Sequence, residues 1–289
     1  MPSTIDLRRR IRSTKNTQQI TKAMKMVSAA KLRRAQERML AARPYSAALR
    51  QVLASLATRV DLAKHPLLGE RETESKVLLL VVTADRGLCG AFNANILRAA
   101  QNAISEHHNW QHVELLPIGR KAIDFFKRRP IPIRRQGAHV YQALSLDTAR
   151  EISNGIIEDF VSGEFDAIYV LYNEFKSVIA QRVTLERLLP LPRPTVEANE
   201  PPAIDYLYEP GPEAILADLL PKHIEFQLYR VLLESAAAEQ GARMTAMEAA
   251  TKNASEMIGH LTLTYNRIRQ ASITKEIIEI VSGAAAAGH

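Results

Sequence analysis

Both ends of the chain carry long stretches that are almost free of glycine and proline. Residues 3–60 contain no glycine and only one proline, Pro44, while residues 222–282 contain two glycines and no proline. Since these residue types are the usual interruptions of a helix, each stretch is predicted to form one long helix. At 1.5 Å per residue the C-terminal helix would extend about 90 Å, far more than an ordinary globular helix. Pro44 predicts a kink in the N-terminal helix.

Apolar and small residues recur in both stretches at the alternating three- and four-residue spacing of a coiled coil. The N-terminal repeat comprises Leu32, Ala35, Met39, Ala42, Ser46, Leu49, Leu53, Leu56 and Val60. The C-terminal repeat comprises Ile224, Leu228, Val231, Ser235, Ala238, Ala242, Thr245 and Ala249, and a second one in a shifted register comprises Met247, Ala250, Ala254, Met257, Leu261, Thr264, Ile268 and Ala271. We expect the two helices to pair antiparallel, because a compact domain between them can bring their bases together. Pairing of each helix with another chain is the alternative.

Between these helices, short apolar runs alternate with helical patterns. Strands are expected at 76–84, 113–118 and 166–172, with a shorter one at 131–133, and helices at 92–107, 121–128 and 147–161. The main strands lack polar alternation, which indicates a sheet covered on both faces. The predicted fold class is therefore α/β: a long antiparallel coiled coil of the terminal helices with a central Rossmann-like parallel-sheet domain.

Three regions follow from this pattern. They are a coiled-coil helix over residues 1–62, an α/β domain over 75–205, and a second coiled-coil helix with its tip over 212–289. A proline-rich stretch, LLPLPRPTVEANEPP, marks the end of the central domain.

Charge is distributed unevenly along the chain. Residues 1–50 hold 13 Lys or Arg and two acidic residues, a net charge of +11, whereas the rest of the chain carries −4. Such a segment fits an acidic partner, which could be nucleic acid, an anionic membrane surface or an acidic protein face, although a solvated basic face is equally compatible with it. The longest apolar run has six residues, and the N-terminus has no secretory pattern, so neither a membrane span nor a signal peptide is expected.

No catalytic or metal-binding pattern emerges. The turn DRGLCGAFN after the first strand has GxxG spacing at Gly87 and Gly90, which more readily gives a tight turn than a nucleotide site. Cys89, the only cysteine, is expected to be buried or to face a partner rather than to react. His107, His108 and His112 lack accompanying ligand spacing, so a solvated helix end is favoured over a metal site. No cofactor is therefore expected, and the chain is predicted not to be an enzyme by itself.

The last turns of the C-terminal helix have apolar residues around most of their circumference. Among them are Ile268, Ile273, Ile277, Ile278, Ile280 and Val281. One antiparallel partner covers a single stripe, so this end is expected to be enclosed by other subunits. A frayed, aggregation-prone end is the alternative.

Four separate segments resemble the gamma subunit of F-type ATP synthase, of the bacterial type. They are IRSTKNTQQITKAMKMVSAAKLRRAQ, TADRGLCGAFN, the linker DYLYEP, and GARMTAMEAATKNA with YNRIRQASITKEIIEIVSGAAA, in matching order from end to end. The resemblance implies a central-stalk rotor that couples ion-driven rotation of a membrane c-ring to ATP synthesis or hydrolysis. Its implied partners are a ring of alternating alpha and beta subunits, the epsilon subunit and the c-ring, with no nucleic acid. It also implies a peripheral location on the cytoplasmic face of the bacterial plasma membrane.

The same resemblance implies roles for individual residues. Contacts with the alpha–beta ring are implied for Met24, Lys25, Arg86, Cys89, Arg243, Gln270, Thr274, Glu276 and Ile278, and a foot near epsilon and the c-ring for Tyr206 and Tyr208. Two other functions stay open from the residues alone: a basic coiled-coil protein that binds nucleic acid, and a nucleotide-binding enzyme that uses the turn at Gly87–Gly90.

Overall fold

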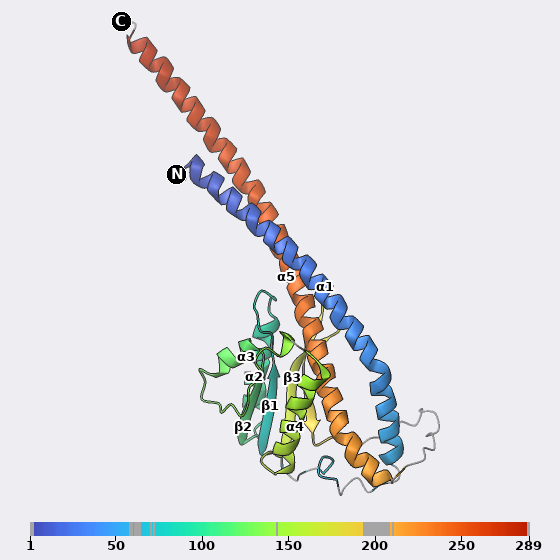
Figure 1. Ribbon diagram of the computed structural model, residues 1–289. Coiled ribbons are helices and arrows are strands. Elements are labelled where there is room, and N and C mark those ends of the chain that lie inside the picture. The colour runs from blue at the N-terminus through green and yellow to red at the C-terminus, as the bar shows by residue number, and fades with distance from the viewer. Residues whose placement is uncertain are drawn as a thin grey trace. The chain divides into compact units, whose positions relative to one another are not determined.

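The computed structural model describes residues 3–57, 60, 65–69, 71, 73–142, 144–192, 209 and 211–287. Its helices are α1 (Thr4–Ala57), α2 (Phe92–Glu106), α3 (Arg120–Phe126), the 3₁₀ turn η2 (Val140–Gln142), α4 (Leu146–Val161) and α5 (Pro212–Ala287), and its strands are β1 (Lys76–Val82), β2 (His112–Ile118), β3 (Ala167–Phe175) and β4 (Gln181–Leu189) (Figure 1). Contacts divide the chain into two compact units, Ala29–Arg243 and Met1–Ser28 with Met244–His289. Each unit is described separately.

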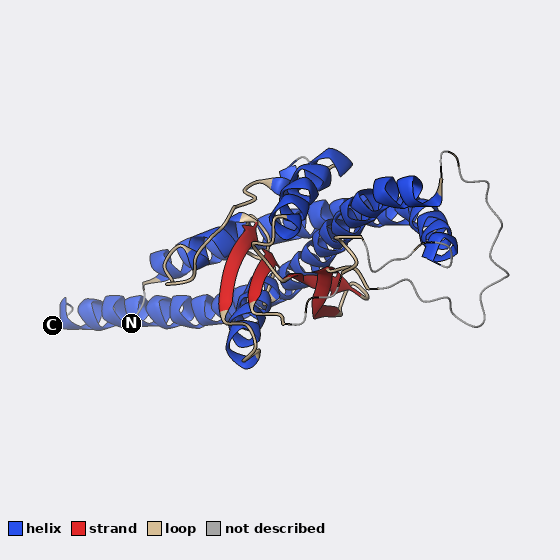
Figure 2. Cartoon of the chain, turned by 90° about the horizontal axis from the view of Figure 1, so that it is seen from below, coloured by secondary structure: helices blue, strands red, loops and turns tan. Residues whose placement is uncertain are grey.

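The larger unit is built on a four-stranded sheet of order β2-β1-β3-β4 (strands in Figure 2). β1 pairs parallel to β2 and to β3, with Leu79 opposite both Leu115 and Tyr169. β4 pairs antiparallel to β3. The predicted strands 76–84, 113–118 and 166–172 are therefore confirmed as a parallel core, and 131–133 contributes only a single bridge, between Leu115 and Ile133.

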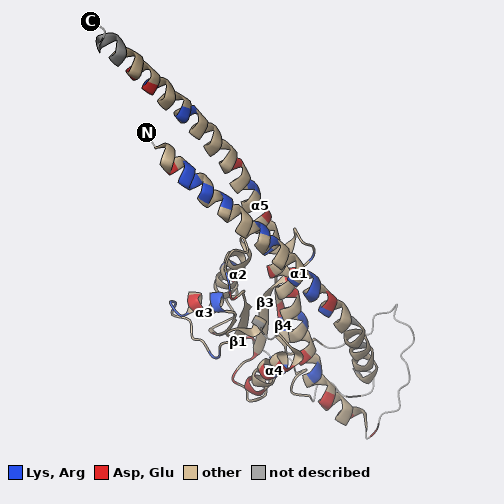
Figure 3. Cartoon of the chain, turned by 45° about the horizontal axis from the view of Figure 1, so that its top comes forward, with Lys and Arg blue, Asp and Glu red and all other residues tan. Residues whose placement is uncertain are grey.

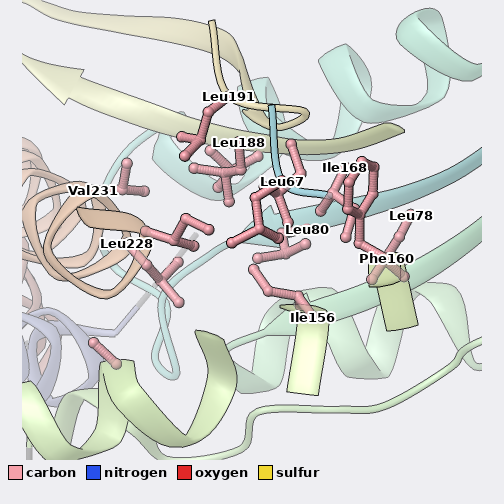
Figure 4. Close-up of a cluster of buried hydrophobic side chains, with 14 of the residues drawn as sticks. Leu67, Leu78, Leu80, Ile156, Phe160, Ile168, Leu188, Leu191, Leu228 and Val231 are labelled. Atoms are coloured by element: carbon pink, nitrogen blue, oxygen red, sulfur yellow. The ribbon is translucent and has the colours of Figure 1, made fainter. Parts of the chain in front are cut away.

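Helices cover both faces of this sheet. On one face, Leu79 and Val81 of β1 pack with Ile96 of α2 and with Ala122 and Phe126 of α3. On the other face, alternate β1 residues pack against α4 and against parts of α1 and α5, as Figure 4 shows for Leu78, Leu80, Ile156, Phe160 and Leu228. All the β1 side chains after Lys76 are buried. This burial on both faces explains why the sequence of the strand is a continuous apolar run.

The predicted repeats of α1 and α5 meet within this larger unit. Leu49, Leu53 and Leu56 of α1 are buried in one cluster with Leu220, Ile224 and Leu228 of α5. Further along, Leu32 and Ala35 pack with Ala237, and Tyr45 stacks on Phe226 with ring centroids 4.0 Å apart. Residue numbers rise along α1 as they fall along α5, so the expected antiparallel pairing is confirmed. Pro44 lies inside α1, which curves in this part without breaking (Figure 1).

The smaller unit pairs the other halves of the same two helices, again antiparallel. Its cross-helix contacts join Arg8 to Tyr265, Thr14 to Met257, Thr21 to Thr251 and Lys25 to Glu248. Here α1 continues the heptad spacing through Leu7, Ile11, Thr14, Gln18, Thr21, Lys25 and Ser28, all buried or half-buried. The buried stripe of this half is largely polar, so hydrophobic periodicity alone does not reveal it.

Three expectations for the fold need correction. The sheet is mixed rather than wholly parallel, because a short turn at 176–180 returns the chain directly into β4. The strand at β4 had not been expected, since its residues Arg182, Glu186 and Arg187 interrupt the apolar pattern. The proline-free pattern placed the last helix from Lys222, whereas α5 begins at Pro212, the start of the third predicted region, and runs through Pro221.

Candidate partner-binding surfaces

The C-terminal turns of α5 expose a run of large apolar side chains on the smaller unit. From Arg269 to Ser282 every residue is exposed. The exposed apolar side chains include Ile273, Ile277, Ile278, Ile280 and Val281, of which Ile278 has 58% of its surface in solvent. A helix that is apolar on several sides normally lies inside a protein. We call this segment, 269–282, the α5 tip.

Three of the polar residues expected to contact the ring lie on the same tip. Gln270, Thr274 and Glu276 are all exposed. The hydroxyl of Thr274 donates to the Gln270 carbonyl at 2.9 Å, and Glu276 accepts a hydrogen bond from Ser272 at 3.2 Å. These contacts stay within one helix, so the amide of Gln270 and much of the Glu276 carboxylate are available to a partner.

Met24 and Lys25 lie on α1 in the smaller unit. Figure 3 shows basic residues along this helix. Met24 and Lys25 are both half-buried. The Lys25 ammonium is 2.6 Å from the Glu248 carboxylate on α5, and the two side chains are 37% and 60% exposed. Sequence reasoning had given Lys25 an acidic partner in another subunit; within this chain it already has one.

The basic face of α1 also carries a contact with a tyrosine. Arg8 donates to the Tyr265 hydroxyl at 2.7 Å, and this hydrogen bond lowers the pKa of Tyr265. Both groups lie at the surface, where ion pairs and polar contacts are weak. Arg8 therefore keeps its positive charge at the surface, available to an acidic partner.

A third surface is the turn Asp85–Gly90, which leads from β1 into α2. Thr83, just before it, is buried; its hydroxyl oxygen accepts from the Ala122 amide at 2.8 Å, and Asp85 accepts from the Arg120 amide at 3.0 Å. The amide oxygen of Asn93 accepts from the backbone of Ala84 at 3.0 Å. The turn is therefore fixed by hydrogen bonds to α2 and α3, in agreement with the structural interpretation of its glycines.

Cys89 lies inside this turn with 1% of its surface exposed. Burial raises the pKa of its thiol, which Arg243 partly offsets, so it is a poor nucleophile at neutral pH. Of the two expectations kept for this residue, burial is the one that the structure supports. Its side chain therefore cannot contact a partner directly in this conformation, and we retain only the surrounding turn as a candidate surface.

Arg86 lines a cavity of about 630 Å³ beside this turn. The other charged residues of its wall are Lys31, Arg34, Arg38, Asp85, Glu239 and Arg243. Arg243 is only 8% exposed. Its guanidinium is 2.6 Å from Glu239 and donates to the carbonyl of Gly87 at 3.2 Å. Sequence reasoning missed this pair, although the Glu–Arg spacing of four residues on one helix could have suggested it.

The remaining candidates lie elsewhere. Tyr206 and Tyr208 fall outside the described residues. His107 stacks on Trp110 at 4.2 Å, and its Nδ1 is 2.8 Å from the Ala103 carbonyl at the end of α2. Within the described part of the chain, no group of three potential metal ligands occurs and no helix is long and apolar enough to cross a membrane.

Comparison with known proteins shows which family this chain belongs to. The family model described as ATP synthase matches residues 3–287. A relative from Chlorobaculum parvum, an ATP synthase gamma chain, is 50% identical over 288 residues, 98% of each chain. Another gamma chain, from Solibacter usitatus, is 53% identical over 291 residues, 99% of this chain and 100% of the relative. The chain belongs to the ATP synthase gamma-chain family.

Solved structures of mitochondrial ATP synthases contain chains with the same fold. A chain of the Euglena gracilis mitochondrial ATP synthase matches with a TM-score of 0.68 at 21% identity, over 98% of this chain and 94% of that one. A chain of the Tetrahymena thermophila central stalk and c-ring matches with a TM-score of 0.61 at 25% identity, over 80% and 99%. As a gamma chain, the protein is the rotor subunit of the central stalk and a non-catalytic part of an ATP synthase.

Proposed function

We propose that this gamma chain turns inside a ring of alternating alpha and beta subunits and transmits the ion-driven rotation of the c-ring to the catalytic sites of that ring. The α5 tip is the observation that carries this proposal. Several large aliphatic side chains stand exposed on different sides of one helix there. Their transfer from water would be worth roughly 25 cal/mol per Å² buried, and an encircling host buries all sides at once.

The mechanism follows from the asymmetry of the chain. The charges on α1, the polar side chains near the α5 tip and the turn at Asp85–Gly90 lie on different elements, so a rotating chain presents different groups to each catalytic site. A rotor must leave every orientation again, which favours contacts that differ between orientations but are individually modest. The mixed polar and apolar surface of the α5 tip meets this requirement.

Further partners and the location belong to the same proposal. We assign Tyr206 and Tyr208 to a foot that meets epsilon and the c-ring, and the chain to the cytoplasmic face of a bacterial plasma membrane, held there only through the complex. Its bacterial relatives support this location. The three regions 1–62, 75–205 and 212–289 remain our proposed division by function, with the first and third forming the axle.

Co-expression with alpha and beta subunits tests the proposal. We expect one copy of this chain per three alpha and three beta subunits, ATP hydrolysis by the complex and none by the purified chain. Replacing Ile278 with Asp should reduce recovery of the complex at least about ten-fold, because a charge would have to be buried in an apolar sleeve. Since Ile278 is exposed, the free chain should keep its stability. Wild-type assembly of this variant would contradict an apolar sleeve.

Nucleic-acid binding is the competing function. It predicts a steeply salt-dependent affinity for DNA through the basic residues of α1. Titration of labelled DNA in the presence of alpha and beta subunits separates the two functions. We expect the subunits to displace any DNA, and DNA binding that survives their addition would argue against the rotor.

A further inference from the structure

The turn Asp85–Gly90 holds an exposed leucine in an uncommon backbone conformation. Leu88 has φ of 62° and is 65% exposed. The left-handed region costs a residue with a side chain about 1 kcal/mol, and such residues persist only where the surroundings hold them. The fold therefore keeps the large apolar side chain of Leu88 in solvent despite the cost of its backbone conformation.

Arg243 supplies a strong restraint on this turn. One guanidinium nitrogen lies 2.6 Å from Glu239, and the other donates to the carbonyl of Gly87, next to Leu88, at 3.2 Å. Arg243 and Glu239 are both more than nine-tenths buried. Hydrogen bonds to buried charged groups are stronger than neutral ones, and loss of one partner leaves the other charge unpaired. The pair therefore fixes a backbone carbonyl of the turn to α5.

The far side of the turn is anchored through Cys89. Its side chain is buried in a cluster with Ala84, Phe92 and Ala238, and the Asn93 amide donates to its sulfur at 3.2 Å. Leu88 is consequently flanked by two anchored residues, Gly87 and Cys89. Its exposure is a consequence of its neighbours being fixed rather than of a loose loop.

We propose that Arg243 is a positioning residue which, paired with Glu239, locks the turn Asp85–Gly90 so that Leu88 is presented to an apolar socket on a partner protein. Cations of the cavity wall beside the turn, among them Arg34, Arg38 and Arg86, favour a socket bordered by carboxylates. This proposal rests on the proposed function, because the socket would be supplied by the subunits of the ring. It reassigns Arg243 from direct contact with the ring to a role inside the gamma chain.

The reactivity of Cys89 tests the lock in the free full-length chain. Cys89 is the only cysteine, so the rate of modification by a soluble disulfide reagent reports on this turn alone. We expect Arg243→Ala to raise the rate about ten-fold and Arg243→Lys to raise it less, because lysine offers one nitrogen in place of two. Removal of the cation would by itself raise the thiol pKa and slow the reaction, so acceleration reports opening of the turn.

The matched control is Arg33→Ala on α1. Arg33 forms the same kind of Arg–Glu pair at a spacing of four residues, with Glu37, but in solvent, and its replacement should leave the rate unchanged. An unchanged rate in both Arg243 variants would overturn the lock. If Arg243→Ala does not fold by circular dichroism, the result for Arg243→Lys decides.

A double-mutant cycle in the assembled complex tests the role of Leu88. Arg243→Lys should lower ATP turnover about three-fold when Leu88 is present and have little further effect in a Leu88→Ala background, because the lock would act through Leu88. Effects that multiply independently would show that Arg243 contacts the ring by itself and would overturn the proposal. If the wild-type chain formed no complex, the proposed function would fail, whereas the thiol measurement would still report on the lock.

Discussion

Single residues are most tightly constrained where β1 ends and the chain turns toward α2 and α3. Gly119 has φ of +89°, and a Cβ built on it would lie 2.1 Å from the carbonyl oxygen of Thr83. Gly87, in the neighbouring turn, would place its Cβ in open space. The structure therefore requires glycine at Gly119 but not at Gly87.

We predict that Gly119→Ala lowers the free energy of unfolding by about 3 kcal/mol or more, because both the backbone conformation and the contact with Thr83 become unfavourable. Gly87→Ala should change it by less than about 0.5 kcal/mol. Urea denaturation of the free chain measures both. Equal stability of the two variants would contradict the close approach at Gly119.

The Lys25–Glu248 pair gives a second prediction for single residues. Both side chains are substantially exposed, so Lys25→Glu should cost less than about 1 kcal/mol of stability. In the complex, we expect it to reduce the proton transport obtained per ATP hydrolysed, measured in membrane vesicles, because an acidic partner would meet a like charge.

The exchanged pair, Lys25→Glu with Glu248→Lys, is the control for this experiment. It restores the contact within the chain but not a contact with another subunit. We expect coupling to stay reduced in the double variant. Full recovery of coupling would mean that Lys25 acts only through its contact with Glu248.

Elements differ in how far the sequence reveals them. β1 and β3, buried on both faces, are predictable as continuous apolar runs, and the second half of α1 is predictable from its leucines. The first half of α1 is not, because Thr14, Thr21 and Ser28 occupy its heptad positions. β4 is hidden for a related reason: it is an edge strand whose charges form ion pairs, such as Arg187 with Glu74 at 3.1 Å.

The α5 tip gives a prediction at the scale of one element. Replacing Gln270 and Thr274 together with alanine should leave the helix intact, since alanine favours helices. Turnover of the complex should fall, because both polar side chains are exposed on the element proposed to enter the ring. Steady-state ATP hydrolysis measures the effect, with circular dichroism as the control for helicity. Wild-type turnover of the variant would contradict a functional contact of Gln270 and Thr274 with the ring.

At the scale of the whole chain, the candidate surfaces were only partly predictable. Periodicity located the apolar α5 tip, and the charge distribution located the basic helix, because both are properties of one segment. The buried state of Cys89 was left open, and the Arg243–Glu239 pair was missed. These depend on α5 packing against a turn far away in sequence, as the Arg243–Gly87 hydrogen bond shows.

One edge of the sheet is partly covered by backbone bridges within the chain, and the other edge carries charged side chains. Beside β2, bridges from Ile133 to Leu115 and from Gly137 to Ile118 use part of the outer backbone. Along β4, Arg182 pairs with Glu174 at 3.1 Å and Glu186 with Arg230 at 2.6 Å. Charged, partly covered margins discourage strands of neighbouring molecules from adding on. A newly synthesised copy that is not yet assembled should therefore resist amyloid-like stacking through the sheet. Before assembly, the apolar α5 tip is the surface that chaperones would have to cover.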